Sequence, residues 1–433
     1  MSKISKSTFA FVLVAMLVAA CAAPATTVAP VEQSTPGAAA FCGSAQSGDT
    51  LSLMYQWTGA EETNLNTILK PFVDACGVQI TSESTRDAAV LDTRVKSTPP
   101  DILFWPTTAP LTLYPTQLKD LSALGAATAN YSQYWLDLGT SGGQLLALPA
   151  KVDIKSIIWY SPARFTALGY TVPTTFEELN TLVDKMAADG NVPWSMGFEN
   201  GAATGWTGSD FIQDLLLTQQ GPQYVLDIIN GTVPYNDAGV VTAYETYKKW
   251  ASDPMYTVGG ATGTLNTGFL DAIYLVFQPQ PAAMMVKQSG FAGGEVVKQF
   301  PTLTYGTDYD FFAFPGIQGM QGGADYVMAF SDSAAAKALL AYLTGPDGAA
   351  TWAKTGFDLS PNKLAIGQYT DPQLIKKADA LDKATGFTPD LGDTIPAPFG
   401  EAEWRAIIAV VQGEDIKTSL DPVAAAQNQA LGK

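Results

Sequence analysis

The chain has 433 residues, and its 41 Asp and Glu against 24 Lys and Arg give a formal net charge of −17 with no histidine. At roughly 100 to 200 residues per domain, this length predicts two domains. The absence of histidine excludes Ser-His-Asp and Cys-His catalytic systems and zinc sites that use histidine. The acidic balance argues against nucleic acid as a partner, because phosphates favour a basic face.

The first segment has the pattern of an export signal. Two lysines precede an unbroken apolar run of 12 residues at 9–20, which is shorter than the roughly 20 residues of a membrane-spanning helix. The run ends in Val18-Ala19-Ala20-Cys21, which resembles the bacterial lipobox. Residues 1–21 are therefore predicted to be a lipoprotein signal peptide with Cys21 as the lipidated residue, and 22–48 a flexible tether. An ordinary signal peptide with a chance cysteine is the alternative.

Two further cysteines, Cys42 and Cys76, would lie outside the cytoplasm, where disulfides persist. Cys42 precedes the first predicted strand and Cys76 ends the first predicted helix, so a bridge would hold the N-terminal edge of the domain. Two unpaired thiols are the alternative, and in either case the role is structural. A metal site is not expected from two distant cysteines without histidine.

Strands and helices alternate in the first part of the chain. Apolar runs predict strands at 51–57, 78–82 and 101–105, with a helix at 61–75 and another that carries Val90, Leu91 and Val95. Segments 145–148 and 156–160 continue the strands. This alternation is typical of an α/β fold, in which a parallel sheet is wound with helices.

The middle of the chain is mostly helical, and strand character then returns. A capping box of Thr174 with Glu177 predicts a helix running to about residue 188. Further helices are predicted at 240–251, 269–277 and 334–343, and strands at 281–286, 309–314 and 326–330. The returning strands predict a chain that crosses back to the first domain. We expect a mainly N-terminal lobe at 49–160, a mainly C-terminal lobe at 161–330 that crosses back near 281–330, and helices packing across both at 331–433.

The ends of the predicted strands carry aromatic and charged side chains. Ligands of such sheets lie at the carboxyl ends of strands. Lys151, Asp153 and Lys155 alternate with apolar residues, so they project from one side. Aromatic faces interleaved with carboxylates suit a sugar, whose C–H faces pack on tryptophan and whose hydroxyls need fixed donors and acceptors. The residues in question are Trp57, Glu61, Arg86, Trp105, Asp153, Trp206 and Asp210.

Plainer explanations exist for the same residues. The helix dipole alone would favour Glu61, capping alone would explain Asp87, and a solvated strand face would explain the alternating charges. Tryptophans can simply fill a core, as the apolar helical spacing around Trp250 and Trp352 predicts.

A series of short motifs runs along the chain in a fixed order. They are the lipobox, Trp57-Thr58-Gly59-Ala60-Glu61-Glu62, Thr85-Arg86-Asp87, Pro99-Pro100-Asp101-Ile102, Gly142-Gly143, Lys151-Val152-Asp153-Ile154-Lys155, Gly201-Ala202-Ala203-Thr204-Gly205-Trp206, Gly208-Ser209-Asp210, Gly322-Gly323-Ala324-Asp325, Phe357-Asp358-Leu359-Ser360-Pro361-Asn362 and the stretch 393–404. In order and spacing these motifs resemble bacterial extracellular solute-binding proteins of carbohydrate ABC transporters, closest to the α-glucoside-binding group. The resemblance spans essentially the whole mature chain.

The resemblance implies a two-lobed periplasmic-binding-protein-like fold of type II, with a mixed sheet flanked by helices in each lobe and the ligand in the cleft between them. It implies a monomer that is not an enzyme, uses no cofactor or metal, and captures a mono- or oligosaccharide by hinge closure. The partners implied are the permease subunits of an ABC transporter, and the lipid anchor would be the sole attachment to the outer face of the cell membrane.

The ligand-binding residues carried over from the resemblance are Trp57, Glu61, Arg86, Trp105, Asp153, Trp206, Asp210, Gly323, Asp325, Asp393 and Trp404. One segment departs from the family pattern. Residues 386–393 lack the arginine that the family tends to place before its last aspartate. No arginine contact is therefore carried over from that segment.

Two other functions stay open. A lipid-anchored glycoside hydrolase or lyase needs two carboxylates roughly 5 to 10 Å apart, and Glu61, Glu199 and Asp210 are the candidates. A peptide or metal-ion binder on the same fold is the other alternative. The lack of histidine disfavours transition metals, and the many tryptophans disfavour a purely ionic ligand.

Overall fold

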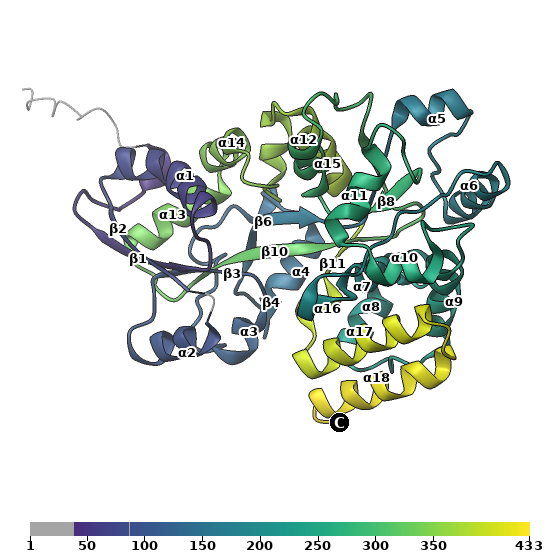
Figure 1. Ribbon diagram of the computed structural model, residues 1–433. Coiled ribbons are helices and arrows are strands. Elements are labelled where there is room, and N and C mark those ends of the chain that lie inside the picture. The colour runs from purple at the N-terminus through teal and green to yellow at the C-terminus, as the bar shows by residue number, and fades with distance from the viewer. Residues whose placement is uncertain (1–38, 86) are drawn as a thin grey trace, which may run out of the picture. The chain divides into compact units, whose positions relative to one another are not determined.

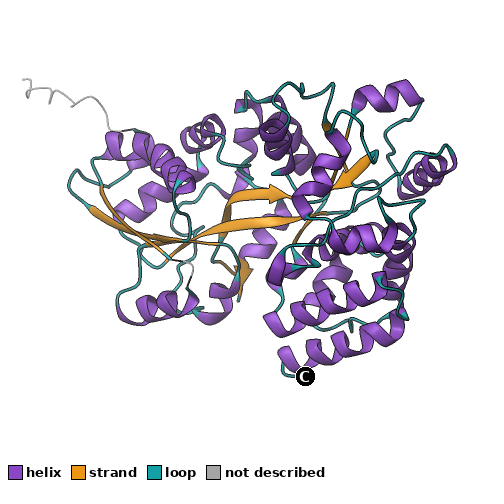
Figure 2. Ribbon diagram, in the orientation of Figure 1, coloured by secondary structure: helices purple, strands orange, loops and turns teal. Residues whose placement is uncertain are grey.

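The computed structural model describes residues 39–433 apart from residue 86 (Figure 1). The predicted signal peptide, the predicted lipidation residue Cys21 and most of the predicted tether lie outside the described residues, and so does Arg86. The described part is an α/β protein in which helices flank the strands (Figure 2). None of its helices is long and apolar enough to cross a membrane.

The larger sheet has six strands and gathers segments from distant parts of the chain. β1 (Thr50–Tyr55) pairs in parallel with β2 (Gln79–Ser84) and β3 (Ile102–Trp105). β10 (Met320–Ala329) pairs antiparallel with both β3 and β6 (Leu148–Ile154), and β11 (Phe387–Pro389) lies parallel beside β10. The chain therefore returns to its first sheet after the helical middle.

Helices α1 (Ala60–Cys76) and α2 (Ala88–Ser97) follow β1 and β2. The apolar residues of α1 recur at helical spacing, and Leu65, Ile68 and Phe72 are fully buried. Asp87 caps α2, because its carboxylate accepts a hydrogen bond from the amide of Ala89. Its role as the helix N-cap is enough to explain why an aspartate stands at position 87.

A second sheet of three strands lies within the helical middle of the chain. β7 (Ile157–Tyr160) is its central strand and pairs antiparallel with β8 (Met285–Lys287) and β9 (Asp310–Ala313). The helices of this part are α5 (Pro162–Leu168), α6 (Phe176–Ala188), α7 (Trp206–Gln219), α8 (Pro222–Ile229), α9 (Ala238–Ser252), α10 (Gly260–Asn266), α11 (Phe269–Phe277) and α12 (Ala292–Gln299).

The remaining elements are shorter connections and the C-terminal helices. They are α3 (Ala109–Leu113), α4 (Gln133–Gly139), β4 (Thr140–Ser141), β5 (Gln144–Leu145), α13 (Ala334–Thr344), α14 (Pro346–Thr355), α15 (Pro372–Lys383), α16 (Leu391–Thr394), α17 (Ala397–Val411) and α18 (Ile416–Ala430).

The buried side chains form two hydrophobic cores. One core joins the larger sheet to α1, α13 and α14 and includes Trp352. The other joins α6, α7, α9, α17 and α18 and includes Trp250. Both tryptophans are buried, so the prediction from their spacing is confirmed. The C-terminal helices contribute to both cores, α13 and α14 to the first and α17 and α18 to the second.

The predicted capping box is wrong by one residue. α6 begins at Phe176, and the box joins Thr175 to Glu178 rather than Thr174 to Glu177. The Thr175 hydroxyl accepts a hydrogen bond from the Glu178 amide, and the Glu178 carboxylate accepts one from the Thr175 amide. Sequence spacing could not distinguish the two threonine–glutamate pairs, because the residues of each pair are the same distance apart in the chain. Thr174 instead donates its amide and its hydroxyl to the Glu178 carboxylate.

Several predicted strands have the wrong bounds. The strand predicted at 145–148 is absent, since β5 ends at Leu145 and β6 begins at Leu148. The strand predicted at 281–286 is reduced to β8, which starts only at Met285, after a proline that has no amide to donate. β10 begins at Met320 rather than at residue 326, because Gly322 and Gly323 hide the strand in the apolar pattern. Gly322 is required there, since a Cβ would collide with the carbonyl oxygen of Asp153 on β6.

Cys42 and Cys76 are joined in a disulfide in which the Cα atoms are 5.5 Å apart. Replacing both by alanine is expected to lower the free energy of unfolding by about 3 kcal/mol, because the bridge closes a loop of about 35 residues in the unfolded chain. Urea unfolding of the double variant measures the loss. Reduction of the disulfide in the native protein should cause the same loss of unfolding free energy. A loss below about 1 kcal/mol in the double variant would contradict the prediction.

Candidate functional site

Strand β6 presents three charged residues on one face. Lys151, Asp153 and Lys155 alternate with Val152 and Ile154, which are fully buried. Lys155 directly follows the last residue of the strand. The alternation in sequence thus predicts the arrangement correctly, and each lysine is the centre of a separate network of carboxylates.

The first network surrounds Lys151. Its ammonium lies 3.1 Å from Asp358, 3.4 Å from Asp325 and 3.4 Å from Glu61. It also lies over the ring of Phe357, 4.9 Å from the centroid. Burial would lower the pKa of Lys151, but the three carboxylates together raise it above its usual value. This lysine therefore stays charged at every physiological pH.

Asp325 is held in place by residues at the end of β1. Its carboxylate accepts hydrogen bonds from Gln56 Nε2 at 3.0 Å and from Trp57 Nε1 at 3.3 Å. Burial raises the pKa of Asp325, and Lys151 opposes that shift. Trp57 is only 1% exposed, because its ring packs against Phe104 and Phe357. In this arrangement Trp57 acts on the site through its N–H rather than through an open face.

The second network surrounds Lys155. Its ammonium contacts Asp390 directly, and lies 3.3 Å from Asp393 and 3.6 Å from Asp210. The ring of Trp206 lies 5.7 Å away. Burial would lower the pKa of Lys155, but Asp210, Asp390 and Asp393 raise it well above its usual value. The two β6 lysines are thus built alike, each with three carboxylates and an aromatic ring.

Asp210 and Asp390 are both buried and contact the same lysine. Burial raises the pKa of Asp210 well above its usual value, whereas Asp390, which is also desolvated, has its pKa lowered by Lys155. A further lysine, Lys287, lies 3.9 Å from Asp210 and 3.3 Å from Asp214. Carboxylates therefore outnumber lysines in this network.

Asp153 lies between the two lysines of β6. It stands opposite Gly323 in the register of β6 and β10. Among the described residues, no hydrogen bond reaches its carboxylate, so its oxygens can accept from a ligand. Burial and then Asp358 raise the pKa of Asp153 to about 6, against the effect of three lysines. A Cβ at Gly323 would meet open space, so the strand leaves room beside this carboxylate.

A cavity of about 620 Å³ opens at this face of β6 and β10. Four of the predicted residues line it, namely Asp153, Gly323, Asp325 and Asp393. Trp57 and Glu61 lie one contact away, on Asp325 and Lys151. Trp206 and Asp210 lie further back, because they touch Lys155, which itself contacts the lining residues Asp390 and Asp393. Most of the predicted site is thus gathered around one cavity.

The remaining predicted residues are placed differently. Trp105 is buried and stands opposite Tyr326 of β10, outside the lining of the cavity. Trp404 is partly buried beside Gly205, where a Cβ would lie 3.1 Å from the Cβ of Trp404. Glu199, a candidate for the hydrolase alternative, pairs through its backbone with Gly268 and does not line the cavity.

Two indole N–H groups, one beside Lys155 and one beside Gly205, have no acceptor. Nε1 of Trp206 and Nε1 of Trp404 are buried and lack a hydrogen-bond partner among the described residues. Buried donors are almost always paired in native proteins. Both side chains are partly buried rather than core. A polar ligand that reached these two N–H groups would find them without a competing partner among the described residues.

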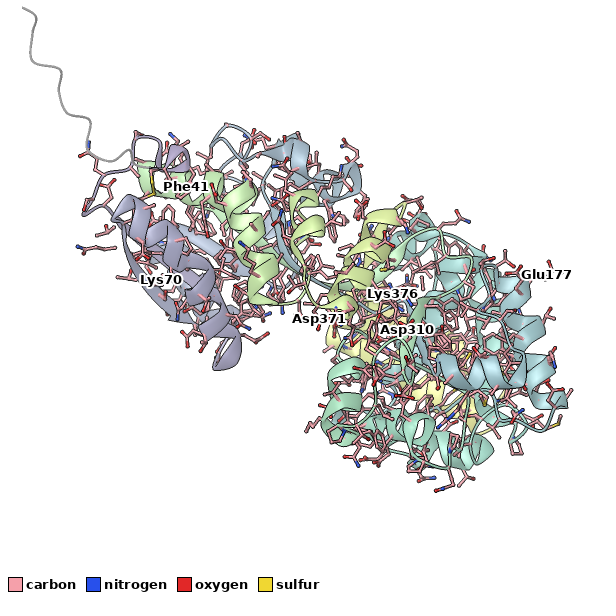
Figure 3. All side chains as sticks on the ribbon, turned by 90° about the horizontal axis from the view of Figure 1, so that it is seen from above. Phe41, Lys70, Glu177, Asp310, Asp371 and Lys376 are labelled. Carbon is pink, nitrogen blue, oxygen red and sulfur yellow. A yellow bond between two sulfur atoms is a disulfide. The ribbon has the colours of Figure 1, made fainter. Side chains whose placement is uncertain are left out.

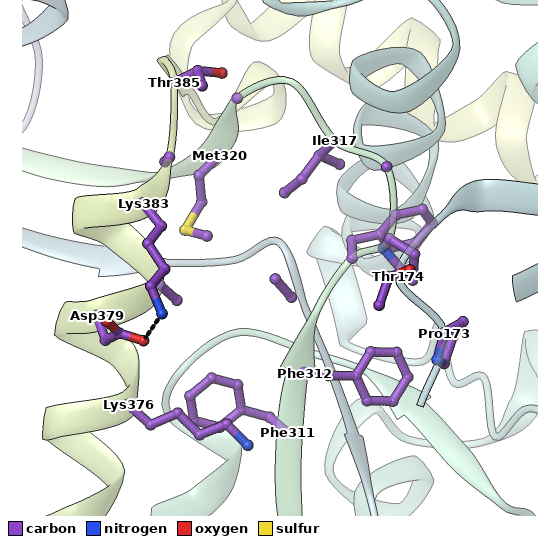
Figure 4. A pocket seen from close by; sticks show the side chains of 17 residues that line it. Pro173, Thr174, Phe311, Phe312, Ile317, Met320, Lys376, Asp379, Lys383 and Thr385 are labelled. Carbon is purple, nitrogen blue, oxygen red and sulfur yellow. Dashed lines mark hydrogen bonds and ion pairs between the residues drawn. The ribbon is translucent and has the colours of Figure 1, made fainter. Parts of the chain in front are cut away.

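A second cavity, of about 410 Å³, has a different character (Figure 4). Phe311 and Phe312 of β9 and Met320 of β10 face it, together with the segment that joins the two strands. Lys383, which also lines it, is paired with Asp379. Lys376, another residue of the lining, is paired with Asp310, 2.7 Å away (Figure 3). This second cavity is lined by none of the predicted site residues, so the polar cavity at β6 is the candidate site.

The sequence prediction missed several residues of the site. Asp358, Asp390 and Gln56 were not among the predicted ligand-binding residues, and neither were the two lysines that organise the networks. Asp358 has φ +48°, a backbone conformation that non-glycine residues rarely adopt. Lysines alternating with an aspartate were the signal in the sequence, whereas the missed partners Asp358 and Asp390 lie more than 200 residues further along the chain than the lysines that they contact.

Comparison with known proteins now places the chain. The family model described as bacterial extracellular solute-binding protein matches residues 77–350. The α-glucosides-binding periplasmic protein AglE of Rhizobium meliloti is 32% identical over 412 residues, covering 88% of this chain and 86% of that protein. The chain belongs to the bacterial extracellular solute-binding protein family.

A second sequence relative and several solved structures are also similar to this solute-binding protein. The osmoprotective compounds-binding protein GgtB of Synechocystis is 28% identical over 372 residues, covering 82% of this chain and 87% of that protein. Among solved structures, the bacterial solute receptor AcbH has a TM-score of 0.73 at 20% identity, covering 89% of this chain and 98% of that one. Apo RafE of Streptococcus pneumoniae has a TM-score of 0.72 at 15% identity, with coverage of 89% and 99%. The two-lobed solute-binding fold predicted from the sequence is confirmed.

One buried acid of this solute-binding protein lies behind the site. Glu403 is 0% exposed and accepts hydrogen bonds from Ser209 at 2.9 Å and Tyr235 at 2.6 Å. Ser209 precedes Asp210, and Trp404 follows Glu403. Burial raises the pKa of Glu403 to about 7, although both hydrogen bonds oppose the shift. No described lysine or arginine pairs with it.

Glu403→Gln is expected to stabilise the protein at pH 8 and to change little at pH 5. The folded pKa is above the unfolded one, so the native protein loses stability as pH rises between the two values. The full loss above pH 7 is on the order of 3 kcal/mol. Urea unfolding of both proteins at pH 5 and pH 8 measures the difference in their free energies of unfolding. A difference that is the same at both pH values would contradict this explanation.

Proposed function

We propose that this protein captures a saccharide in the cavity at β6 and β10 and delivers it to an ABC permease from the outer face of the cell membrane. Membership of the family makes it an extracellular solute-binding protein of the sugar-binding transporter type. The proposed ligand class is an α-glucoside or related oligosaccharide, and the similarity to AglE supports it. The lipid anchor at Cys21 is part of the proposal.

One observation supports a saccharide most directly. An open carboxylate, Asp153, lines the cavity, and the ring of Trp206 with its unpaired N–H lies beside Lys155, which contacts the lining residues Asp390 and Asp393. Sugar hydroxyls both donate and accept, and sugar C–H faces pack on aromatic rings, so a saccharide can meet all three demands at once. The proposed contacts are Asp153, Gly323, Asp325 and Asp393, which line the cavity, together with Trp206 beside Lys155. Lys151, Lys155 and Asp390 hold these side chains in place.

The proposed mechanism is capture by closure of a hinge. A saccharide that contacts both lobes would stabilise the closed arrangement by its differential contacts. This closure should lower the radius of gyration when ligand is added, and small-angle X-ray scattering measures that change. No catalytic step is proposed, because the relatives are binding proteins.

A thermal-shift panel of glucose, maltose, trehalose, sucrose and longer α-glucans tests the function. A ligand that binds only the folded state raises the melting temperature by mass action. We expect a rise with at least one of these sugars at millimolar concentration. Absence of any rise would overturn the proposal, and release of reducing sugar on incubation would favour the hydrolase alternative instead.

A further inference from the structure

The charges around the cavity are strongly one-sided. Its lining carries four carboxylates, Asp153, Asp325, Asp390 and Asp393, against the single ammonium of Lys151. Behind the lining, each β6 lysine already has three carboxylate partners. No described lysine at the cavity therefore has positive charge to spare for a negative ligand.

Asp393 differs from the other carboxylates of its network. Its side chain is 74% exposed, whereas those of Asp210 and Asp390 are buried against Lys155. One ammonium is shared by all three carboxylates, so Lys155 compensates the charge of Asp393 only in part. It is the carboxylate of this network that an entering ligand meets in solvent.

We propose that the cavity takes uncharged saccharides and rejects anionic ones, and that Asp393 is the residue that sets most of this discrimination. This inference rests on the proposed saccharide function and adds the charge class of the ligand. An anionic sugar would lose its hydration and find carboxylates instead of a paired cation, which is unfavourable. A neutral sugar meets the same carboxylates as hydrogen-bond acceptors for its hydroxyls.

The test compares maltose and trehalose with the derivatives in which their primary hydroxyls are oxidised to carboxylates, which differ little in size from the parent sugars. Isothermal titration calorimetry at low salt is expected to show binding of the carboxylates at least about tenfold weaker than that of the parents. High salt should narrow the gap, because charge on an exposed side chain is screened. A purely steric rejection would not depend on salt.

Asp393→Asn should narrow the same gap by about threefold or more. Asp74→Asn is the matched control, since it removes the same charge from an exposed pair with Lys70 elsewhere on the surface, and it should leave the gap unchanged. Two results would overturn the inference. One is that the oxidised sugars bind within threefold of their parent sugars, and the other is that Asp393→Asn leaves the difference in affinity between them unchanged. Failure of both parent sugars and the wider panel to bind would instead overturn the proposed function.

Discussion

Lys155→Met is expected to lower the free energy of unfolding by about 3 to 5 kcal/mol at pH 7, because it leaves buried carboxylates without their cation. Lys155 is the shared partner of Asp210, Asp390 and Asp393. Methionine keeps the length and the apolar stem of the side chain, so the loss reports on charge rather than on volume. Urea unfolding of the purified variant measures it.

The pH dependence distinguishes this cause from a packing defect. Without the ammonium, the buried carboxylates have folded pKa values above their unfolded ones, so the stability of the variant falls as pH rises from about 4 to 7. The gap to the native protein should therefore shrink toward pH 4. Lys70→Met, which removes an exposed lysine paired only on the surface, is the control and should cost at most about 1 kcal/mol. A gap that is constant with pH would contradict the charge explanation.

Trp206→Ala is expected to weaken saccharide binding by about 2 kcal/mol or more, roughly 30-fold, because it removes an aromatic face and an unpaired N–H donor together. The ring lies beside Lys155 and has one edge-to-face contact with Phe269, with centroids 5.5 Å apart. Stability without ligand should fall by only about 1 kcal/mol, the size of such an aromatic pair. Calorimetry and unfolding of the same preparation measure the two effects.

Trp206→Phe separates the two contributions of this side chain. Phenylalanine keeps an aromatic face but has no N–H, so its affinity should lie between those of the native protein and the alanine variant. Binding by the alanine variant within about threefold of the native protein would place Trp206 outside the site. A loss of unfolding free energy above about 3 kcal/mol would show instead that the ring is part of the core.

The fold was predictable where local pattern decides the structure. The helix expected at 269–277 is α11 with the same bounds, because an apolar run there follows Gly268 and is followed by a proline-rich stretch. The start of β10 was not predictable, because its glycines serve the close approach of β6, a strand far away in the chain. Local pattern carries no information about such an approach.

The site shows the same division. Alternation along 151–155 predicted a common face for its charges, and that is observed. It could not identify Asp358 and Asp390 as the partners, because these residues reach the lysines only through the fold. Nor could the sequence pattern distinguish Trp57, which is enclosed in the core, from Trp206, which is only partly buried. Both have glycine or charged residues as neighbours in the sequence, but Phe104 and Phe357 enclose Trp57 from distant segments.

The spacing of the two β6 lysines limits how this receptor can change over evolution. Because strand side chains alternate between faces, inserting or deleting one residue within 148–155 would turn Val152 and Ile154 toward the cavity and bury the charges. Both networks would fail together. Specificity can therefore diverge through the loops that supply the carboxylates, while the length of β6 stays constant. Chimeric receptors should accordingly join their parent sequences outside this strand.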